Sequence, residues 1–286
     1  SVPARSLTGS QSGIITDESH ANAQVLEVRP DRIKQCLADG HVVIVAGFQG
    51  VSREREVTTL GRGGSDTTAV VLAAALNAEY CEICSDVDGV WSADPRTVPN
   101  AVKLDELSLD EALTLSRAGA KVLFEDAVAY ARTKGVTIVA ASTFGPGAGT
   151  RLTALSASRS RPIAVSSDDQ LVRVELPVDG ESEVLSALDQ RGARLRRQLN
   201  RQAWFDVRNV HGSRLNGAVP TAVVSVVGRS IGEDMSIWPA GNRALQQLGV
   251  TISATASGGD EVWWEVEPAR VVESTRALHD CFIDAD

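Results

Sequence analysis

Thr58-Thr59-Leu60-Gly61-Arg62-Gly63-Gly64-Ser65-Asp66 precedes an apolar run over residues 69–76. The run predicts a helix. Ser65 or Asp66 is its expected N-cap, because a side-chain oxygen there accepts a bond from an unpaired amide of the first turn. The glycines let a ligand approach the backbone closely, and a helix N-terminus beside Arg62 attracts anions. The stretch therefore predicts a site for a carboxylate or a phosphate. The alternative is a tight strand-to-helix turn with a surface arginine.

The composition excludes several classes of function. A length of 286 residues with 43% apolar residues is enough for two domains with full cores. The net charge of −9 disfavours binding to nucleic acid, because a polyanion attracts basic proteins. The basic tract Arg191–Arg201 is expected to be a solvated face of a helix or an edge strand. No apolar run approaches the roughly 20 residues that span a bilayer, so we expect no membrane association.

The ends and the cysteines give further expectations. The chain opens at Ser1 without a signal-peptide pattern and without methionine, so we expect a fragment or a processed product. Cys81 and Cys84 have the spacing of a metal pair, but a strand there would point them to opposite faces. We expect the four cysteines to be buried free thiols in a reducing cytoplasm, and no metal held by the protein.

Strands and helices alternate over the first 150 residues. Helices are predicted at 32–40, at 69–76 and from Ser108 onward, where Ser108 and Glu111 have the spacing of a capping box. Apolar runs predict buried strands at 41–46, 80–85 and 136–141. This alternation predicts an α/β fold with a mainly parallel sheet, and the loops 48–66 and 85–96 follow strands on the edge where ligands collect.

A breaker cluster at Gly145–Thr150 predicts a hinge, and two α+β modules follow it. The pattern predicts a strand at 171–176 and a helix at 182–191 for the first module. For the second it predicts a βαββα unit with strands at 222–227, 250–254 and 261–266 and helices at 240–248 and 269–282.

The loop Ser85–Arg96 is the second concentration of polar chemistry. Asp86 and Asp88 have a spacing common in magnesium loops, Trp91 is suited to stack on a base, and Arg96 is suited to a phosphate. The alternative is a turn rich in aspartate that caps a strand.

Together these motifs resemble one family, the aspartate kinases of the amino acid kinase superfamily. The resemblance rests on the stretch 58–69 together with four further motifs in matching order: Ala46-Gly47-Phe48-Gln49-Gly50, Ser85-Asp86-Val87-Asp88-Gly89-Val90, Ala93-Asp94-Pro95-Arg96 and Gly119-Ala120-Lys121-Val122-Leu123. The segment Thr8–Gly13 also matches. The resemblance implies an amino acid kinase domain, in part, over residues 1–152. It also implies ACT-like regulatory domains over 153–286, divided at about 162–218 and 219–286.

The resemblance also implies a reaction and its residues. The side-chain carboxylate of L-aspartate would be phosphorylated by ATP, giving 4-phospho-L-aspartate for lysine, threonine and methionine biosynthesis. Arg62 would grip a substrate carboxylate and Asp66 would organise the catalytic groups, while Phe48, Gly63 and Ser65 would complete the amino-acid pocket. The nucleotide, with Mg²⁺, would be surrounded by Ser85, Asp86, Trp91, Arg96 and Lys121. The ACT-like pair implies an amino-acid effector and a homo- or heterodimer.

Two departures from the family pattern leave alternatives open. The Lys-Phe-Gly-Gly-Thr-Ser loop that opens the family and holds the ATP phosphates does not occur in this chain, so we expect the chain alone to be close to inactive. Phe124-Glu125-Asp126 stands where the family has His-Pro or a basic equivalent. A non-catalytic paralogue or regulatory subunit that pairs with an active kinase is therefore an alternative. A kinase of the same superfamily acting on another carboxylate or a carbamate is a third.

Overall fold

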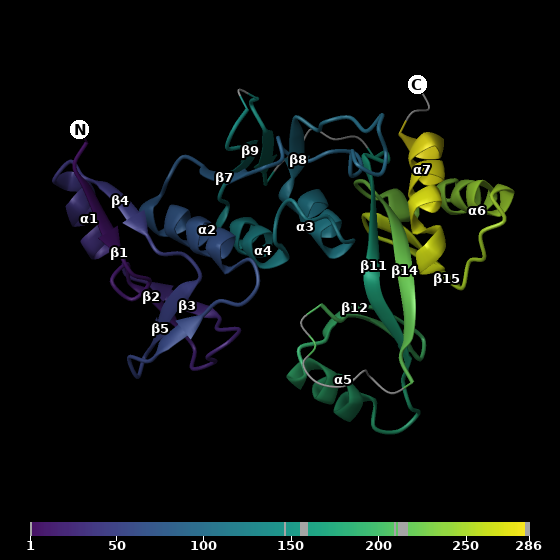
Figure 1. Ribbon diagram of the computed structural model, residues 1–286, viewed down its shortest axis with the longest axis horizontal. Helices are drawn as coiled ribbons and strands as arrows, with labels where there is room; N and C mark the ends of the chain where they lie inside the picture. The colour runs from purple at the N-terminus through teal and green to yellow at the C-terminus, as the bar shows by residue number, and fades with distance from the viewer. Residues whose placement is uncertain (1, 146, 155–159, 209, 211–216, 284–286) are drawn as a thin grey trace. The chain divides into compact units, whose positions relative to one another are not determined.

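A computed structural model describes residues 2–145, 147–154, 160–208, 210 and 217–283 (Figure 1). The chain divides into two compact units. The first comprises Ser1–Val90, Lys103–Ser116 and Lys121–Ala157. The second comprises Trp91–Val102, Arg117–Ala120 and Ser158–Asp286, so two short segments from the N-terminal half belong to it.

Parallel pairing dominates the central sheet of the first unit, as predicted. Its strand order is β7-β9-β10-β8, and β7 (Cys81–Ser85) runs parallel to β9 (Ile138–Ser142). β10 (Thr150–Thr153) is antiparallel to β9 and parallel to β8 (Glu106–Ser108). A separate parallel pair joins β1 (Ala4–Leu7) to β4 (Val42–Val45). The strands predicted at 41–46, 80–85 and 136–141 are thus confirmed within about two residues.

The burial predicted for the strand at 41–46 is wrong. Val42 and Ile44 are 50% and 56% exposed, whereas Val43 and Val45 are half-buried. Within the described part of the chain β4 pairs with β1 alone, in a sheet of two strands, so only one of its faces is covered.

A third sheet of four short strands was not predicted, and it positions the glycine-rich stretch. Its order is β3-β2-β5-β6, formed by Val25–Val28, Ile14–Thr16, Gln49–Ser52 and Val57–Thr59. β5 and β6 are antiparallel, and Thr16 Oγ1 and Thr58 Oγ1 are hydrogen-bonded at 2.6 Å in the buried interior. The turn 60–63 leaves this sheet from the end of β6.

Four helices belong to this half of the chain, and two of them test specific predictions. They are α1 (Asp31–Ala38), α2 (Gly64–Leu76), α3 (Leu109–Arg117) and α4 (Glu125–Lys134). The capping box before α3 is confirmed: the Ser108 backbone N–H donates to Glu111 Oε2 at 2.8 Å, and the Glu111 N–H donates to Ser108 Oγ at 3.1 Å. The N-cap predicted for α2 is wrong, because Gly63 at φ 73° occupies that place and Ser65 and Asp66 lie in the first turn.

The second unit is built on one six-stranded antiparallel sheet. Its order is β12-β13-β11-β14-β16-β15. The long strands β11 (Ala164–Glu175) and β14 (Val219–Val227) pair along most of their length, with a register shift between Asp168 and Leu171. The outer strands are β12 (Arg194–Leu199), β13 (Gln202–Asp206), β16 (Glu261–Val266) and β15 (Ala254–Gly258).

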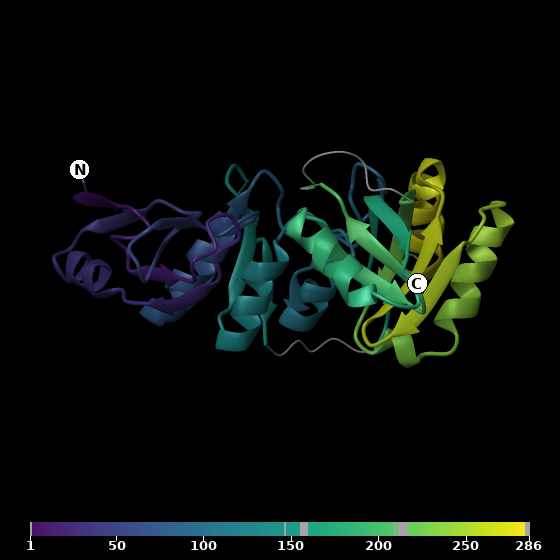
Figure 2. The same cartoon turned by 90° about the horizontal axis from the view of Figure 1, so that it is seen from below.

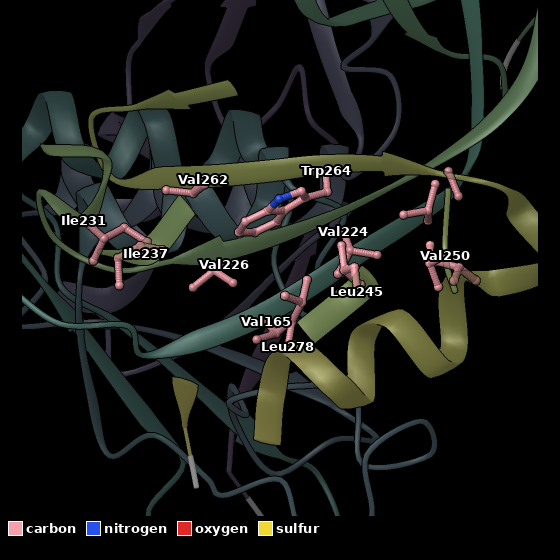
Figure 3. Packing of buried hydrophobic residues seen from close by; sticks show 13 residues of the cluster. Val165, Val224, Val226, Ile231, Ile237, Leu245, Val250, Val262, Trp264 and Leu278 are labelled. Atoms are coloured by element: carbon pink, nitrogen blue, oxygen red, sulfur yellow. The ribbon is translucent and has the colours of Figure 1, made fainter. Parts of the chain in front are cut away.

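Helices of the second unit pack on this sheet through an apolar core. They are α5 (Glu181–Gln190), α6 (Ile237–Gln247) and α7 (Val271–Phe282), with short 3-10 turns at Ile231–Glu233 and Pro268–Arg270 (Figure 2). Trp264 lies at the centre of the β14–β16 half, among Val224, Leu245 and Leu278 (Figure 3). Its indole N–H donates to Asn242 Oδ1 at 2.7 Å, so the buried ring has its polar atom satisfied.

The predicted elements of this half are mostly confirmed, with two differences. The predicted strand at 250–254 lies instead at Ala254–Gly258. The basic tract does form an edge strand, β12, but it is not a solvated face throughout. The Arg197 side chain is only 7% exposed, because it reaches across the sheet face to pair with Glu261 of β16 and lies over the Trp263 ring.

Candidate functional site

The N-termini of α2 and α4 meet in the first unit. Gly63 caps α2 and Phe124 caps α4, and a Cβ added to Gly63 would collide with the Phe124 ring. Only glycine fits here, because the position also has positive φ. Each N-terminus presents unpaired amides and the positive end of a helix dipole. Two such ends side by side form a region that attracts anions.

Exposed cations flank this pair of helix ends. Arg62 precedes Gly63 and has no ion pair among the described residues; its side chain is exposed. Lys121 lies three residues before Phe124 and is exposed as well. A guanidinium suits bidentate contact with a carboxylate, and an ammonium suits a phosphate as a point charge. The arrangement has the charge that two anionic substrates need.

Asp66 and Ser65 lie in the first turn of α2. Ser65 is exposed and Asp66 is half-buried. Burial raises the pKa of the Asp66 carboxyl above its ordinary value. The pKa of the Cys81 thiol is raised to about 11, mainly by burial and also by the negative charge of Asp66. A carboxylate whose pKa is raised by partial burial is a candidate for a functional residue.

Phe48 is held against the start of α2. It adopts φ 71°, unusual for a side chain of this size, and its N–H donates to Thr68 Oγ1 at 3.1 Å. A Cβ on Gly64 would lie 2.8 Å from Phe48 Cδ2, so the ring stands directly against the helix backbone. Phe48 is 42% exposed, so its ring stays accessible beside the start of α2. The role of Thr68 as the acceptor for the Phe48 N–H was not predicted. The sequence signals it only by the place of Thr68 one turn after Gly64.

A cavity of about 490 Å³ borders these residues. It lies between α2 and the strands β4 and β7, and Gly47, Ser65 and Thr68 line one end. The rest of its lining is apolar: Val43, Val45, Ala69, Leu72, Ala73, Leu76, Tyr80 and Cys81. The volume would hold a small metabolite, but Arg62 and Asp66 do not line it. The polar chemistry lies outside the cavity, at the helix N-termini.

Three of the residues predicted for the nucleotide lie in the first unit. Ser85 ends β7, and its hydroxyl closes a turn by accepting the Val87 N–H at 3.1 Å. Asp86 is exposed, and Asp88 is held by Lys103 Nζ at 3.1 Å. Ser85 and Asp86 therefore follow a parallel strand directly, in the place that α/β sheets use for ligands. Lys121 is the third, beside the N-terminus of α4.

The other two, Trp91 and Arg96, belong to the second unit. Trp91 packs half-buried against the small cluster of Ala93, Val98 and Ala101. Arg96 forms two parallel hydrogen bonds of 3.0 Å with the Asp94 carboxylate. This pair is exposed, so it contributes at most about 1 kcal/mol to stability.

The acidic residues that depart from the family pattern have a structural explanation. Glu125 and Asp126 form the first turn of α4, where negative charge is favoured by the helix dipole. Phe124 supplies the ring that closes on Gly63. The two carboxylates therefore have a local role at the start of α4.

The cysteines form no disulfide, and they only partly match expectation. Cys36 and Cys81 are buried, but Cys84 is exposed, since residues three apart on β7 point to opposite faces. Among the residues with described positions, no group of three metal-binding side chains is found. In the same part of the chain, none of the helices has both the length and the apolar character of a membrane span.

Comparisons with known proteins agree with this geometry. Residues 1–142 match the model of the amino acid kinase family. The aspartokinase of Geobacillus stearothermophilus is 34% identical over 305 aligned positions, which cover 98% of this chain and 75% of that protein. This chain belongs to the aspartokinase family. This chain is also 56% identical to the aspartokinase of Corynebacterium glutamicum over 148 residues, which are 51% of this chain and 35% of that protein. The match thus spans about a third of the length of the Corynebacterium protein.

Solved structures of the family share the fold of this chain. E. coli aspartokinase III in complex with aspartate and ADP (R-state) aligns with a TM-score of 0.83 at 22% identity, over 98% of this chain and 70% of that one. The Clostridium acetobutylicum aspartate kinase aligns with a TM-score of 0.75 at 22% identity, over 98% and 71%. The predicted order of an α/β kinase-type part followed by α+β ACT-like domains is confirmed.

Proposed function

We propose that this chain carries the amino-acid side and the regulatory part of an aspartate kinase. The proposed reaction transfers the γ-phosphoryl group of ATP to the side-chain carboxylate of L-aspartate. A carboxylate oxygen forms the new bond to the γ-phosphorus, the bond to the bridging oxygen breaks, and ADP leaves with that electron pair. The observation that carries the proposal is the meeting of two helix N-termini between Arg62 and Lys121. Family membership supports it.

The chemistry requires two anions to approach each other, so fixed positive charge is the main contribution of the protein. We assign Arg62 to a carboxylate of L-aspartate and Lys121 to the phosphates. Phe48, Gly63 and Ser65 shape the amino-acid pocket, and the half-buried Asp66 orients the groups that react. Mg²⁺ would enter with the phosphate oxygens of ATP and offset their charge.

The nucleotide would be bound by Ser85, Asp86, Trp91 and Arg96 together with Lys121. Arg96 would leave its exposed partner Asp94 for a phosphate, and the half-buried Trp91 would offer an aromatic face. A bound ADP in the E. coli aspartokinase III structure supports a nucleotide role for this fold.

The wider assignment follows from the same proposal. Residues 1–152 would be the kinase part, and 153–286 the ACT-like regulatory part, divided at about 162–218 and 219–286. That part would bind an amino-acid effector and assemble as a homo- or heterodimer. We assign the activity to amino-acid biosynthesis in the cytoplasm, where free thiols such as the exposed Cys84 persist.

The test is the affinity for L-aspartate, measured by calorimetry and as KM in an acyl-hydroxamate assay with ATP. Arg62→Ala should raise the Kd and the KM for L-aspartate by about 30- to 100-fold, because a charge-assisted contact contributes about 2–3 kcal/mol. Arg62→Lys should recover only part of this, since it cannot bind bidentately. The exposed Arg32→Ala on α1 is the control. Unchanged aspartate affinity in Arg62→Ala would refute the site.

A regulatory subunit without catalytic activity is the second candidate, and it is favoured by Phe124-Glu125-Asp126, which stands where the family has His-Pro or a basic equivalent. Such a subunit would bind an effector without turning over aspartate. Mixing the chain with an active aspartokinase distinguishes the two: a regulatory subunit changes the effector response of the partner and adds no activity of its own.

A further inference from the structure

A buried hydrogen-bond cluster holds the segment Trp91–Val102 within the second unit. Ser92 Oγ lies 2.9 Å from His279 Nε2 on α7 and accepts the Val102 N–H at 2.9 Å. The Ser92 backbone is bonded on both sides, with its N–H donating to Val102 O at 2.8 Å and its carbonyl accepting the Val165 N–H at 2.6 Å. Ser92 and His279 have no exposed surface. Every polar group of Ser92 is therefore bonded.

The hydrogen bond between Ser92 Oγ and His279 Nε2 can form in either tautomer of the imidazole. The Val102 N–H occupies one lone pair of the Ser92 oxygen. The hydroxyl then donates to an unprotonated Nε2, or a protonated Nε2 donates to the second lone pair. Because a polar group without water depends on its partner, the loss of either residue weakens the whole attachment.

α7 holds the same segment at a second point. Arg276 Nε donates to the Thr97 carbonyl oxygen at 2.7 Å. Arg276 and His279 are three residues apart and so lie on one side of the helix. Between their two contacts lies the turn 93–97, where the Thr97 N–H donates to Asp94 O at 2.8 Å. Helix α7 therefore holds both ends of the turn that carries Arg96.

Strand β11 supports a second segment in the same way. Gly119 has φ 108°, and a Cβ on it would lie 2.7 Å from Ser167 O and 2.9 Å from Asp168 Cβ. Val165, which bonds Ser92, is on the same strand. β11 therefore contacts both the segment of Trp91 and Arg96 and the one that leads directly into Lys121.

We propose that Ser92 and His279 are positioning residues for the nucleotide, acting through Trp91 and Arg96. α7 and β11 form the support, so a shift of either element in the regulatory sheet would change nucleotide affinity without changing affinity for L-aspartate. The inference rests on the proposed function, since that proposal assigns the nucleotide to Trp91 and Arg96.

The experiment compares variants of the protein as it occurs naturally, with ADP binding measured by calorimetry and KM measured for ATP and for L-aspartate. Ser92→Ala and His279→Leu should each raise the Kd for ADP and the KM for ATP about tenfold and leave the KM for L-aspartate unchanged. The double variant should be no worse than either single one. His279→Gln, which keeps a polar group at similar reach, should recover most of the affinity.

Thr275→Val is the matched control. Thr275 is also buried on α7, but its hydroxyl donates to its own helix at Val271 O. Hydrogen exchange at the Val102 and Val165 amides should rise in Ser92→Ala and not in the control. Should His279→Leu not fold, Ser92→Ala and His279→Gln decide the question.

The outcomes separate the two proposals. Folded variants that bind ADP as the wild type does would overturn the positioning role alone. A wild type that binds no adenine nucleotide would overturn the proposed function and this inference with it.

Discussion

Asp66 is subject to two opposing effects in the first turn of α2. A carboxylate near a helix N-terminus is favoured by the dipole, but burial raises the pKa of this one, so desolvation outweighs the dipole. A group held in a charged state that the fold disfavours is common where chemistry is needed. The residue is thus expected to reduce stability and support activity.

Asp66→Asn should therefore be at least as stable as the wild type at pH 7 while losing most of the proposed kinase activity. Because the pKa is raised in the folded state, the wild type loses stability as pH rises through the unfolded value of 3.8 towards the folded value, and the variant does not. Urea unfolding at pH 7 and pH 3 measures this difference, which should vanish at pH 3.

The exposed first-turn Asp31 provides the control, since Asp31→Asn should slightly lower stability at pH 7 through the dipole alone. An Asp66→Asn variant clearly less stable than the wild type at pH 7, or fully active, would contradict the assignment.

The sequence predicted a helix start beside Arg62 but not how its first residues are held there. Composition and spacing indicated an anion site with Arg62 beside a helix start, and the structure has that arrangement. The N-cap was misassigned because Gly63, in the left-handed region, takes that position. A glycine is required there by the contact with Phe124, which lies 61 residues later in the chain. Local patterns do not contain contacts of that range.

At the scale of elements, strands with apolar patterns were predictable and charged strands were not. β16 was predicted at its observed bounds, because it is a mainly apolar run whose residues from Val262 to Val266 are all buried. β13 was missed, and the basic tract that contains β12 was predicted only as a face of a helix or an edge strand, because its arginines conceal the apolar pattern. Their charges are satisfied across strands: Arg208 bonds Asp168 at 2.5 Å and Asp206 at 2.8 Å, and Arg196 bonds Asp206 at 2.9 Å.

This network should make the stability of the fold depend on pH through the Asp206 carboxyl of β13. Burial alone would raise the pKa of Asp206, but hydrogen bonds from Arg208 and Arg196 outweigh it and lower the pKa to about 2. A lowered folded pKa stabilises the fold above the unfolded value of 3.8 and loses that effect as pH falls to about 2. The wild type should lose about 2 kcal/mol more than Asp206→Asn over this interval.

The free energy of unfolding in urea from pH 5 to pH 2 measures this loss. Asp234→Asn is the control, because the Asp234 pKa is also lowered, by Ser236, but the carboxyl is fully exposed and should contribute little. Parallel pH curves for the wild type and Asp206→Asn would show that the arginines do not hold this carboxylate in solution.

At the scale of the whole molecule, the chain contains two compact units, each with its own buried apolar residues. The hinge predicted at Gly145–Thr150, followed by α+β modules, agrees in part with this division. That Trp91–Val102 and Arg117–Ala120 belong to the second unit was not predictable, because the bonds that hold them reach residues such as His279, far along the chain. Separate cores predict separate unfolding transitions, provided that the units do not stabilise each other strongly.

Gly241→Ala should test this division. Replacing a helical glycine by alanine usually stabilises by about 1 kcal/mol, but a Cβ on Gly241 would collide with the buried Trp264 ring. Overpacking costs about 1–3 kcal/mol, so the sign of the effect should reverse. In calorimetry, the transition of the second unit should fall by several degrees while that of the first stays in place.

L-aspartate should do the opposite, because its proposed site at Arg62 lies in the first unit. At about 100 times its Kd, it should stabilise that unit by about 2.7 kcal/mol in the wild type and in Gly241→Ala alike. Gln247→Ala, at an exposed position of the same helix, should leave both transitions unchanged. If Gly241→Ala lowers both transitions together, the two units unfold as one.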